Sequence, residues 1–593
     1  MPVPRSRILN HPRVRRYVSL VREDLSLTYR RDLHKWLIVA PIMGVAAGLL
    51  ISLIAAIILL WIWPPVLRFY YAHPAYMIPG IATGFLIAGL IMQYLTPDPD
   101  EHSTEEIIKS YHQHQGDVEL RPFLPKLLAA IATVGAGGSA ALEGPSIYGG
   151  GMIGSWSWIF LRRFKLESRD RRIMLIAGAA AGMSAVFRAP LTGIVFALEM
   201  PYKDDLAHEA LLPALVASVV SYATMAPLLG ATPLFGFATT GGYTSHDLLW
   251  SALLGLICGL ATMVYTITFR RFRKLCVRST IPHWVKMVAG GILTGVCGLV
   301  FVSLYRDGLV PLGPNYEAVG LVLKQAHSSV ELMVFGVLKL LATLFSLGVG
   351  GVSAAFVPFF LTGGTFGTAF GQSIVHSAMP ELYAAVGMAA FLAGGYKAPL
   401  TAVVFVAETT GGHAFLIPTL IGAAIAYAVS GEASMSSDQR LHENVKIAAL
   451  AQIPVREVMQ TNVMPALAGA TLSQFVEQIG RHDAHPSYPV FDGDHVLGVF
   501  SIASLTTIPP ARWPTLCVRD AVDAEALRVR PDTSVEEALR LLLAHHRRAM
   551  ILVIEDNRLE GILTKSDILN ALDTRGSMPT SSAELPIPAP VSS

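Results

Sequence analysis

The sequence is poor in charged residues and in cysteine. Asp, Glu, Lys and Arg make up 15% of the 593 residues, whereas an ordinary soluble domain carries about 25%. The stretch 340–431 contains only three charged side chains, Glu381, Lys397 and Glu408. The four cysteines have neither the spacing of a disulfide framework nor that of a metal site. These deficits exclude a wholly soluble enzyme, a disordered chain and a disulfide scaffold.

Apolar runs dominate what is present. Residues 36–67 contain no Asp, Glu, Lys or Arg, and this run exceeds the roughly 20 residues that a spanning helix needs. Residues 521–570, in contrast, carry sixteen charged side chains. The sequence therefore predicts an integral membrane protein, surrounded by lipid, with a soluble C-terminal part. A net charge of +2 gives no reason to expect a nucleic-acid partner.

Positive charge predicts the orientation in the membrane. The basic segment 1–35 precedes the first apolar run, and further basic clusters lie at 162–172 and 270–278. Lys and Arg close to spanning helices are enriched on the cytoplasmic side. We therefore expect both chain termini to be cytoplasmic, in a bacterial-type inner membrane or a plasma membrane. The Pro- and Ser-rich segment 575–593 is predicted to be disordered.

The membrane part contains an internal repeat. Gly- and Pro-broken segments that begin at 135 and 348 share seven positions at an offset of 213, the last pair being Gly154 and Gly367, and the similar stretches 188–199 and 397–408 follow at an offset of 209. Broken apolar segments survive at membrane depth only where protein or a polar cavity satisfies their backbone. In duplicated transporters, whose halves are often inverted, such segments mark the binding site. The sequence predicts a duplicated all-helical membrane domain over 36–435.

The two halves differ at Glu143, which aligns with Phe356. A carboxylate inside a charge-free run costs several kcal/mol unless it is protonated, paired or hydrated. Small residues before it and a Gly-Pro pair after it predict a helix N-terminus, where unpaired N–H groups and the helix dipole favour negative charge. Glu143 could there take the place of an anion and act as a gate and proton carrier. The alternative is a structural glutamate whose charge is satisfied.

These motifs resemble those of the CLC family of chloride channels and proton–chloride exchangers. Glu143–Pro145 is similar to the family signature Gly-Lys/Arg-Glu-Gly-Pro, although Ala and Leu replace its first two positions. The stretch 354–358 is similar to Gly-x-Phe-x-Pro, with Ala for the first Gly. The stretch 188–199 resembles the family helix that follows the gate. The resemblance covers about residues 30–440.

The resemblance implies a transport function and a set of site residues. Family members are homodimers with a pore in each subunit, in which helix N-termini bind chloride and an external glutamate, here Glu143, gates the pore. Protons are the second candidate substrate. The anion-binding residues that the resemblance implies at these helix ends are Gly144, Pro145, Ala355 and Phe356.

Three departures from the family concern the inner pore and the proton pathway. The signature Gly-Ser-Gly-Ile-Pro falls on a stretch without Gly or Pro, where His102 or Ser103 replaces the anion-binding serine. The pore tyrosine is expected near 435–436, which reads Met-Ser. The internal proton-transfer glutamate aligns with Met200, one residue after Glu199. These departures favour a channel or a loosely coupled carrier. Strictly coupled exchange, with Glu199 acting through water, is the alternative.

The soluble end contains a second repeat, at an offset of 63. Its copies resemble a pair of CBS domains, which we predict at 452–510 and 515–574. The family's nucleotide-binding pattern is Gly-hydrophobic-hydrophobic-Thr-x-x-Asp, and only the second copy retains it, as Gly561, Thr564 and Asp567. An adenine nucleotide is thus a candidate ligand. A purely structural dimerising module is the alternative.

Two other classes of membrane protein find little support. An intramembrane hydrolase needs a His or Asp placed to activate a serine, and no such motif occurs. A divalent-cation transporter with CBS domains needs an acidic pore, whereas the apolar runs hold few and scattered glutamates. We therefore predict no catalytic residue, no metal site and no required cofactor.

Overall fold

The computed structural model divides the chain into two compact units, residues 1–442 and 443–593. The structure describes residues 30–100, 103–161, 166–235, 242–305, 310–316, 318–320, 327–411, 413–436, 438–440, 450, 453–461, 463–479, 486–493, 495–545, 548, 550–556 and 558–568. Most of the basic segment 1–35, the candidate anion ligand His102 and the predicted disordered segment 575–593 lie outside the described residues.

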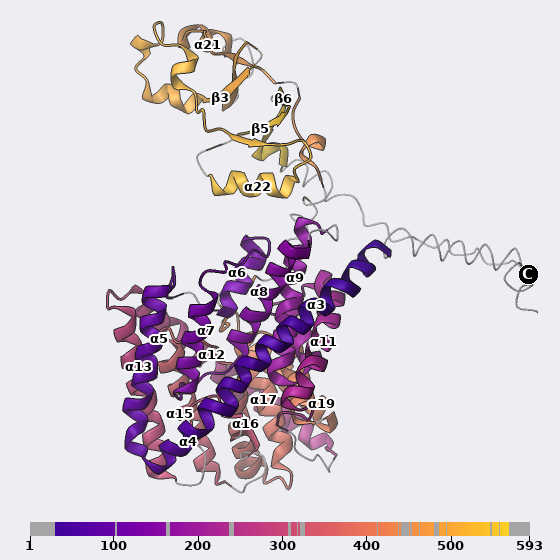
Figure 1. Cartoon of the computed structure of the whole chain (residues 1–593), viewed down its shortest axis with the longest axis vertical. Coiled ribbons are helices and arrows are strands. Elements are labelled where there is room, and N and C mark those ends of the chain that lie inside the picture. The colour runs from indigo at the N-terminus through magenta and orange to yellow at the C-terminus, as the bar shows by residue number, and fades with distance from the viewer. Residues whose placement is uncertain are drawn as a thin grey trace, which may run out of the picture. The chain divides into compact units, whose positions relative to one another are not determined.

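The first unit is a helical bundle over its described residues (Figure 1). Its principal helices are α3 (Arg30–Ala55), α4 (Trp63–Ala72), α5 (Met77–Leu95), α6 (Ser103–Gln113), α7 (Phe123–Gly135), α8 (Glu143–Leu161), α9 (Ser168–Phe187), α10 (Pro190–Glu199), α11 (Leu211–Leu229), α12 (Ser245–Arg278), α13 (His283–Leu304), α15 (Ser329–Leu347), α16 (Phe356–Phe370), α17 (Pro380–Tyr396), α18 (Pro399–Thr410) and α19 (Leu416–Val429). Proline occupies a first helical position of α10, α17 and α18, where its missing N–H costs no hydrogen bond.

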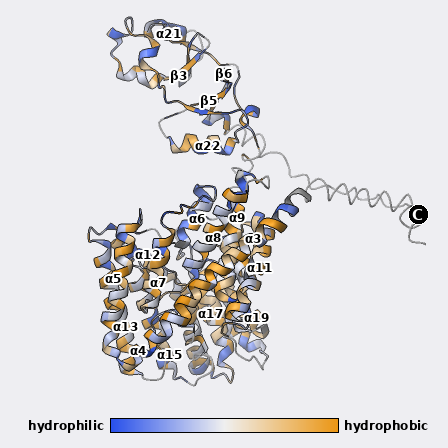
Figure 2. Cartoon of the chain, viewed as in Figure 1, coloured by the Kyte–Doolittle hydropathy of each residue, from blue (hydrophilic) through white to orange (hydrophobic). Residues whose placement is uncertain are grey.

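Several helices of this unit have the length and composition of membrane spans. Within the described residues six helical segments qualify: His34–Ala72, Pro74–Leu95, His208–Leu229, Ser245–Arg278, His283–Leu304 and Ser329–Leu347. Figure 2 shows hydrophobic residues along the middle of the bundle and hydrophilic residues toward its two ends. Large apolar side chains such as Leu53 and Val264 are exposed on its outside. This distribution fits a protein that lies in a bilayer.

Other helices are short and buried. The turn between α7 and α8 and the turn between α15 and α16 each contain a glycine with positive φ, Gly137 at 112° and Gly350 at 114°. Side chains other than glycine rarely adopt this conformation. Glycine also permits close helix packing: a Cβ on Gly150 would overlap the Gly178 carbonyl, and one on Gly363 would overlap the Gly387 carbonyl.

The two halves of the bundle are inverted relative to each other. Ala141 forms an antiparallel bridge with Ala354, its own equivalent in the repeat, and Glu143 contacts its equivalent Phe356. Residues that touch their own equivalents lie on a local two-fold axis. The equivalent helices α8 and α16 start at this axis and point in opposite directions, α8 into the upper half and α16 into the lower half of the bundle in Figure 1. The prediction of a duplicated, inverted fold is confirmed.

Over its described residues the second unit contains two three-stranded sheets of the same topology, with orders β1-β2-β3 and β4-β5-β6. In each sheet the first pair of strands is parallel and the second antiparallel. The register shifts at Val490/Phe491 in one copy and at Val553/Ile554 in the other, equivalent positions of the repeat. The elements are β1 (Ala466–Leu467), α21 (Leu472–Ile479), β2 (Ser487–Asp492), β3 (His495–Ser501), β4 (Leu527–Val529), α22 (Val535–Ala544), β5 (Met550–Glu555) and β6 (Arg558–Thr564).

Candidate functional site

The carboxylate of Glu143 lies at the start of α16. Glu143 is the first residue of α8, and 1% of its surface is exposed. Its Oε1 accepts a hydrogen bond of 2.5 Å from the Phe356 N–H. An N–H group at this position has no partner within its own helix, so a carboxylate or another anion can fill the place. The sequence placed Glu143 at the start of its own helix, and its carboxylate also contacts the start of α16, a helix of the other half.

The two broken turns support each other around this contact. The Ala141 N–H donates to the Ala354 carbonyl at 3.0 Å, and the Ser353 hydroxyl donates to the Ala141 carbonyl. The Ser139 N–H donates to the Ser346 hydroxyl at 3.0 Å. These bonds satisfy irregular backbone that has no helical partner, as membrane depth requires. They also fix the start of α8 against the start of α16.

Tyr396 brings a hydroxyl to the same helix end. It is the last residue of α17, and its hydroxyl oxygen accepts a hydrogen bond of 2.9 Å from the Ala355 N–H. The two N–H groups predicted to bind an anion, those of Ala355 and Phe356, are thus occupied by a tyrosine and a glutamate. The family resemblance places the pore tyrosine near 435–436, where the chain has Met and Ser, and Tyr396 is not among the predicted site residues. In the sequence, Tyr396 stands directly before the repeated stretch 397–408.

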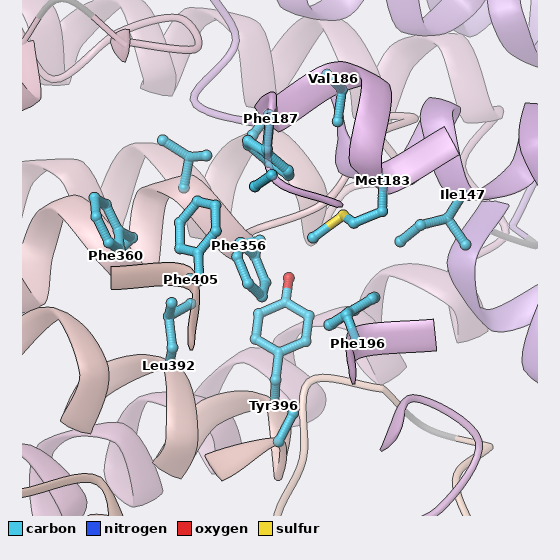
Figure 3. Close-up of a cluster of buried hydrophobic side chains, with 14 of the residues drawn as sticks. Ile147, Met183, Val186, Phe187, Phe196, Phe356, Phe360, Leu392, Tyr396 and Phe405 are labelled. Carbon is cyan, nitrogen blue, oxygen red and sulfur yellow. The ribbon is translucent and has the colours of Figure 1, made fainter. Parts of the chain in front are cut away.

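Aromatic rings surround this pair of polar contacts. The Phe356 ring lies 4.9 Å from that of Phe405, 5.4 Å from that of Phe196 and 5.4 Å from that of Tyr396, measured between centroids. Figure 3 shows these rings, together with Phe187, around the Tyr396 hydroxyl. They come from helices of both halves. The cluster keeps water away from the Glu143 contact, which strengthens its electrostatic interactions.

A small cavity lies on the other side of Tyr396. It has a volume of about 40 Å³ and is lined by residues of α6, α12, α15 and α17, by the turn between α15 and α16, and by Met435 and Ser436. The Thr104 hydroxyl is buried, at 8% exposure of the residue, and has no hydrogen-bond partner among the described residues. Ser103, a predicted anion ligand, is the first residue of α6. Thr104, the next residue along the chain, lines the cavity.

Glu199 caps a helix of the opposite half. Its Oε1 accepts from the Leu400 N–H at 3.1 Å, and its Oε2 accepts from the Thr401 N–H at 2.8 Å and the Thr401 hydroxyl at 2.5 Å. Glu199 ends α10, and the two donor residues lie in the first turn of α18. An acid at a helix N-terminus satisfies orphan N–H groups and interacts favourably with the dipole. Neighbouring Met200 is buried, with 1% exposure.

Glu408 makes the reciprocal contact. It lies in α18, and its carboxylate accepts from the Leu191 N–H at 3.0 Å, the Thr192 N–H at 2.8 Å and the Thr192 hydroxyl at 2.7 Å, at the start of α10. Each residue of this set is the repeat equivalent of one in the Glu199 set. The sequence singled out Glu199 for proton transfer. The structure gives its carboxylate three hydrogen bonds that join the two halves.

Gly144 and Pro145, the remaining predicted anion ligands, are buried in the first turn of α8. Their backbone belongs to the helix end opposite α16, beside Glu143. Tyr396 and Thr104 are the residues that sequence reasoning missed, because their relation to the site depends on helices distant along the chain.

The second unit has a cavity of about 430 Å³ between its two copies. Thr564, Lys565 and Asp567 line it on one side and Tyr488 on the other. The Asp567 carboxylate accepts from the Thr564 N–H at 2.8 Å and the Thr564 hydroxyl at 2.6 Å. Gly561 does not line the cavity. A Cβ on Gly561 would meet the Gln460 carbonyl at 2.7 Å, so this glycine permits a close approach of two backbone segments.

An inverted helical repeat whose broken helices meet at a buried carboxylate defines a membrane transport protein. Residues 84–431 match the family model described as voltage gated chloride channel, and residues 455–509 and 518–574 match the CBS domain. The chain belongs to the voltage-gated chloride channel (CLC) family. It is therefore a transport protein and not an enzyme, as predicted, and the hydrolase alternative is excluded.

Two curated relatives illustrate the likeness in sequence. An uncharacterized protein of Methanocaldococcus jannaschii is 29% identical over 393 residues, which are 66% of this chain and 92% of that protein. The H⁺/Cl⁻ exchange transporter ClcA of Yersinia pestis is 29% identical over 308 residues, which are 50% of this chain and 62% of that protein. The match thus spans less than two thirds of the exchanger's length.

Solved structures share the fold. A CLC-type fluoride/proton antiporter has a TM-score of 0.60 and 21% identity, covering 70% of this chain and 99% of its own. A slow cyanobacterial Cl⁻/H⁺ antiporter has a TM-score of 0.58 and 22% identity, covering 68% and 94%. A eukaryotic CLC transporter has a TM-score of 0.57 and 19% identity, covering 91% and 98%. The predicted CLC-type fold is confirmed.

Proposed function

We propose that this protein transports chloride, and other small anions, across a membrane through a pore within each subunit. The observation that carries the proposal is the hydrogen bond from the Phe356 N–H to the Glu143 carboxylate at the local two-fold axis. A helix N-terminus binds halide and carboxylate for the same reason, because its unpaired N–H groups and dipole attract any compact anion. The carboxylate therefore stands where the transported anion would bind.

Glu143 acts as a proton-operated gate in this proposal. While ionised, its carboxylate occupies the Phe356 N–H and keeps an anion out. Protonation removes the negative charge that the helix end attracts, so the side chain leaves and an anion takes its place. The surrounding Phe196 and Phe405 rings exclude water, so the exchange of carboxylate for anion is the only route that keeps the N–H group satisfied.

Two coupling modes remain candidates. A channel-like or loosely proton-coupled mode is favoured by Met200, since a thioether cannot carry a proton, and by the three hydrogen bonds that engage Glu199. Strict proton–chloride exchange is favoured by the name of the Yersinia relative. The reversal potential of the purified protein under crossed chloride and proton gradients separates them. A value at the chloride equilibrium potential supports the channel, and a shift toward the proton potential supports exchange.

The remaining proposals concern assembly, orientation and the second unit. We propose a homodimer with cytoplasmic termini, on the family resemblance and the charge pattern of the sequence. The cavity beside Thr564 and Asp567 supports adenine-nucleotide binding, because it offers hydroxyl and carboxylate groups for a ribose and the Lys565 cation for phosphate. A structural module without ligand is the alternative.

Chloride efflux from liposomes containing the purified full-length protein tests the main proposal. We expect wild-type efflux to be slow near neutral pH and faster in mildly acidic buffer. Glu143→Gln should already be fast near neutral pH, because an amide cannot hold the gate closed by charge. Glu119→Gln, the same change at an exposed position, should behave like wild type.

Two results would count against the proposal in different ways. An absence of chloride efflux from all three proteins would refute anion transport. Slow efflux from Glu143→Gln near neutral pH, with normal acid activation, would leave transport standing and remove Glu143 as the gate.

A further inference from the structure

An ion pair lines the small cavity behind Tyr396. Arg273 of α12 and Glu105 of α6 form two parallel hydrogen bonds, Nη1 to Oε1 at 3.1 Å and Nη2 to Oε2 at 2.8 Å. Both residues line the cavity, and their side chains are 20% and 13% exposed. Paired, forked contacts of this kind are the strong form of an Arg–carboxylate interaction. The only cation lining the described cavity is thus neutralised by one carboxylate.

Other acidic groups near Arg273 are engaged elsewhere. The Asp100 carbonyl accepts from Arg273 at 3.1 Å, but the Asp100 carboxylate lies 3.4 Å from His283 and 3.8 Å from Lys286. Burial raises the pKa of Asp100, yet the hydrogen bond from His283 and the charges of Lys286, His283 and Arg273 outweigh it, so the pKa lies below its ordinary value. Asp100 therefore stays ionised at neutral pH.

The groups on the neighbouring elements do not compete for Glu105. On its own helix, Glu106 pairs with Lys126 of α7. On α17, Tyr396 lies within electrostatic reach of Glu105 and carries no charge at neutral pH. The other basic side chains around Arg273 on α12 are exposed: Arg270, Arg271 and Lys274. Glu105 is accordingly the only carboxylate among the described residues that line the cavity.

The cavity also contains a polar group that lacks a partner. The buried Thr104 hydroxyl lines it and makes no hydrogen bond within the described part of the chain. The volume of about 40 Å³ exceeds the roughly 10–15 Å³ that one water-sized occupant requires. A hydroxyl donor, a guanidinium and the start of α6 are together a set of groups that binds an anion.

We propose that Arg273 binds the transported anion at this end of the pore and that Glu105 competes with the anion for Arg273. An ionised Glu105 satisfies the guanidinium and keeps the anion out. A protonated Glu105 releases the guanidinium, and the anion binds between Arg273 and Thr104. This inference rests on the proposed function, and it adds a second proton-controlled site to the one at Glu143.

Proton binding and anion binding are linked at this site. Since each favours the other, the linkage is reciprocal: acid raises the anion affinity, and anion raises the proton affinity. Arg273 belongs to the basic cluster 270–278, so the positive-inside rule expects this end to face the cytoplasm. The Arg273–Glu105 pair would thereby couple anion entry to proton uptake at this end. Met200, which aligns with the internal proton-transfer glutamate of the family, cannot bind a proton.

Chloride binding to the full-length protein in detergent, measured by isothermal titration calorimetry, tests the inference. All variants carry Glu143→Gln, which removes the competing gate. In this parent, chloride affinity should rise as the pH is lowered toward about 4, the range in which carboxylates protonate. Adding Glu105→Gln should raise the near-neutral affinity by about fivefold to about 150-fold, the usual range of site–site linkage, and remove the pH dependence. Adding Glu119→Gln should leave the parent's behaviour unchanged.

A double change guards against misfolding. Glu105→Gln leaves the Arg273 charge without its partner, and this can destabilise the protein. The combination of Glu105→Gln with Arg273→Gln leaves no unpaired charge, and it should bind chloride without pH dependence and without the gain in affinity. Parent-like pH dependence in either variant overturns the inference. An absence of chloride binding to every protein would instead refute the proposed transport function.

Discussion

Replacing Glu199 by glutamine tests whether this carboxylate joins the two halves or carries protons. The ionised carboxylate accepts bonds from the Leu400 N–H, the Thr401 N–H and the Thr401 hydroxyl. Glutamine keeps one acceptor oxygen but turns an NH₂ donor toward the other donors. At least one N–H group at the start of α18 then loses its partner in a buried place.

The magnitude follows from these contacts. A hydrogen bond to a charged group contributes about 1.5–3 kcal/mol, and an orphaned buried donor costs about 1–3 kcal/mol. The interaction with the helix dipole adds about 0.3–1 kcal/mol. Because these terms overlap, we expect Glu199→Gln to lower the free energy of unfolding by about 2–4 kcal/mol. Glu408→Gln, its half-buried equivalent, should cost less, about 1–2 kcal/mol, because solvent screens the change.

Two assays on the full-length protein decide between the roles. Unfolding by a denaturing detergent in mixed micelles measures the loss of stability, and proton uptake driven by a chloride gradient in liposomes measures coupling. The capping role predicts lower stability in both variants, larger for Glu199→Gln, with coupling per folded protein unchanged. A Glu199→Gln protein of wild-type stability that has lost proton uptake would refute this reasoning and identify Glu199 as the proton carrier.

Three further changes probe other contacts. Tyr396→Phe leaves the buried Ala355 N–H without a partner and should lower the free energy of unfolding in mixed micelles by about 1–3 kcal/mol; an unchanged value would mean that water replaces the hydroxyl. Asp100 has a lowered pKa, so its stabilising contribution is present above the ordinary carboxyl pKa of about 3.9 and is lost as the pH falls through the folded-state pKa. Asp100→Asn should therefore be less stable than wild type at neutral pH, and thermal unfolding should show this difference in stability disappearing below about pH 4. A difference in stability that does not change with pH would contradict the lowered pKa of Asp100. Millimolar adenine nucleotide should raise the melting temperature of the second unit in the full chain, and Asp567→Ala should abolish the rise. If ATP, ADP and AMP all fail to raise the melting temperature of the wild type, the second unit is a structural module without a nucleotide ligand.

The sequence by itself determined the fold class and singled out Glu143. Gly- and Pro-broken apolar segments at a fixed offset are local signals, because a broken helix in a membrane must line protein or a cavity. Glu143 stood out for an equally local reason, since it is a carboxylate in a charge-free run next to a Gly-Pro pair. The repeat alignment paired Glu143 with Phe356, and the two residues are in contact because they lie on the local two-fold axis.

Only the tertiary structure decided which other side chains complete the site. Tyr396 reaches the Ala355 N–H from the end of a different helix, and Arg273 reaches Glu105 across 168 positions of the chain. Glu199 looked like a displaced proton carrier, yet it caps a helix 202 positions away. Residue type and spacing cannot specify such contacts, because the partner of a side chain depends on how the two inverted halves bring distant helix ends together. The sequence pattern shows that the two halves are repeats of each other. It does not show how the halves pack against each other.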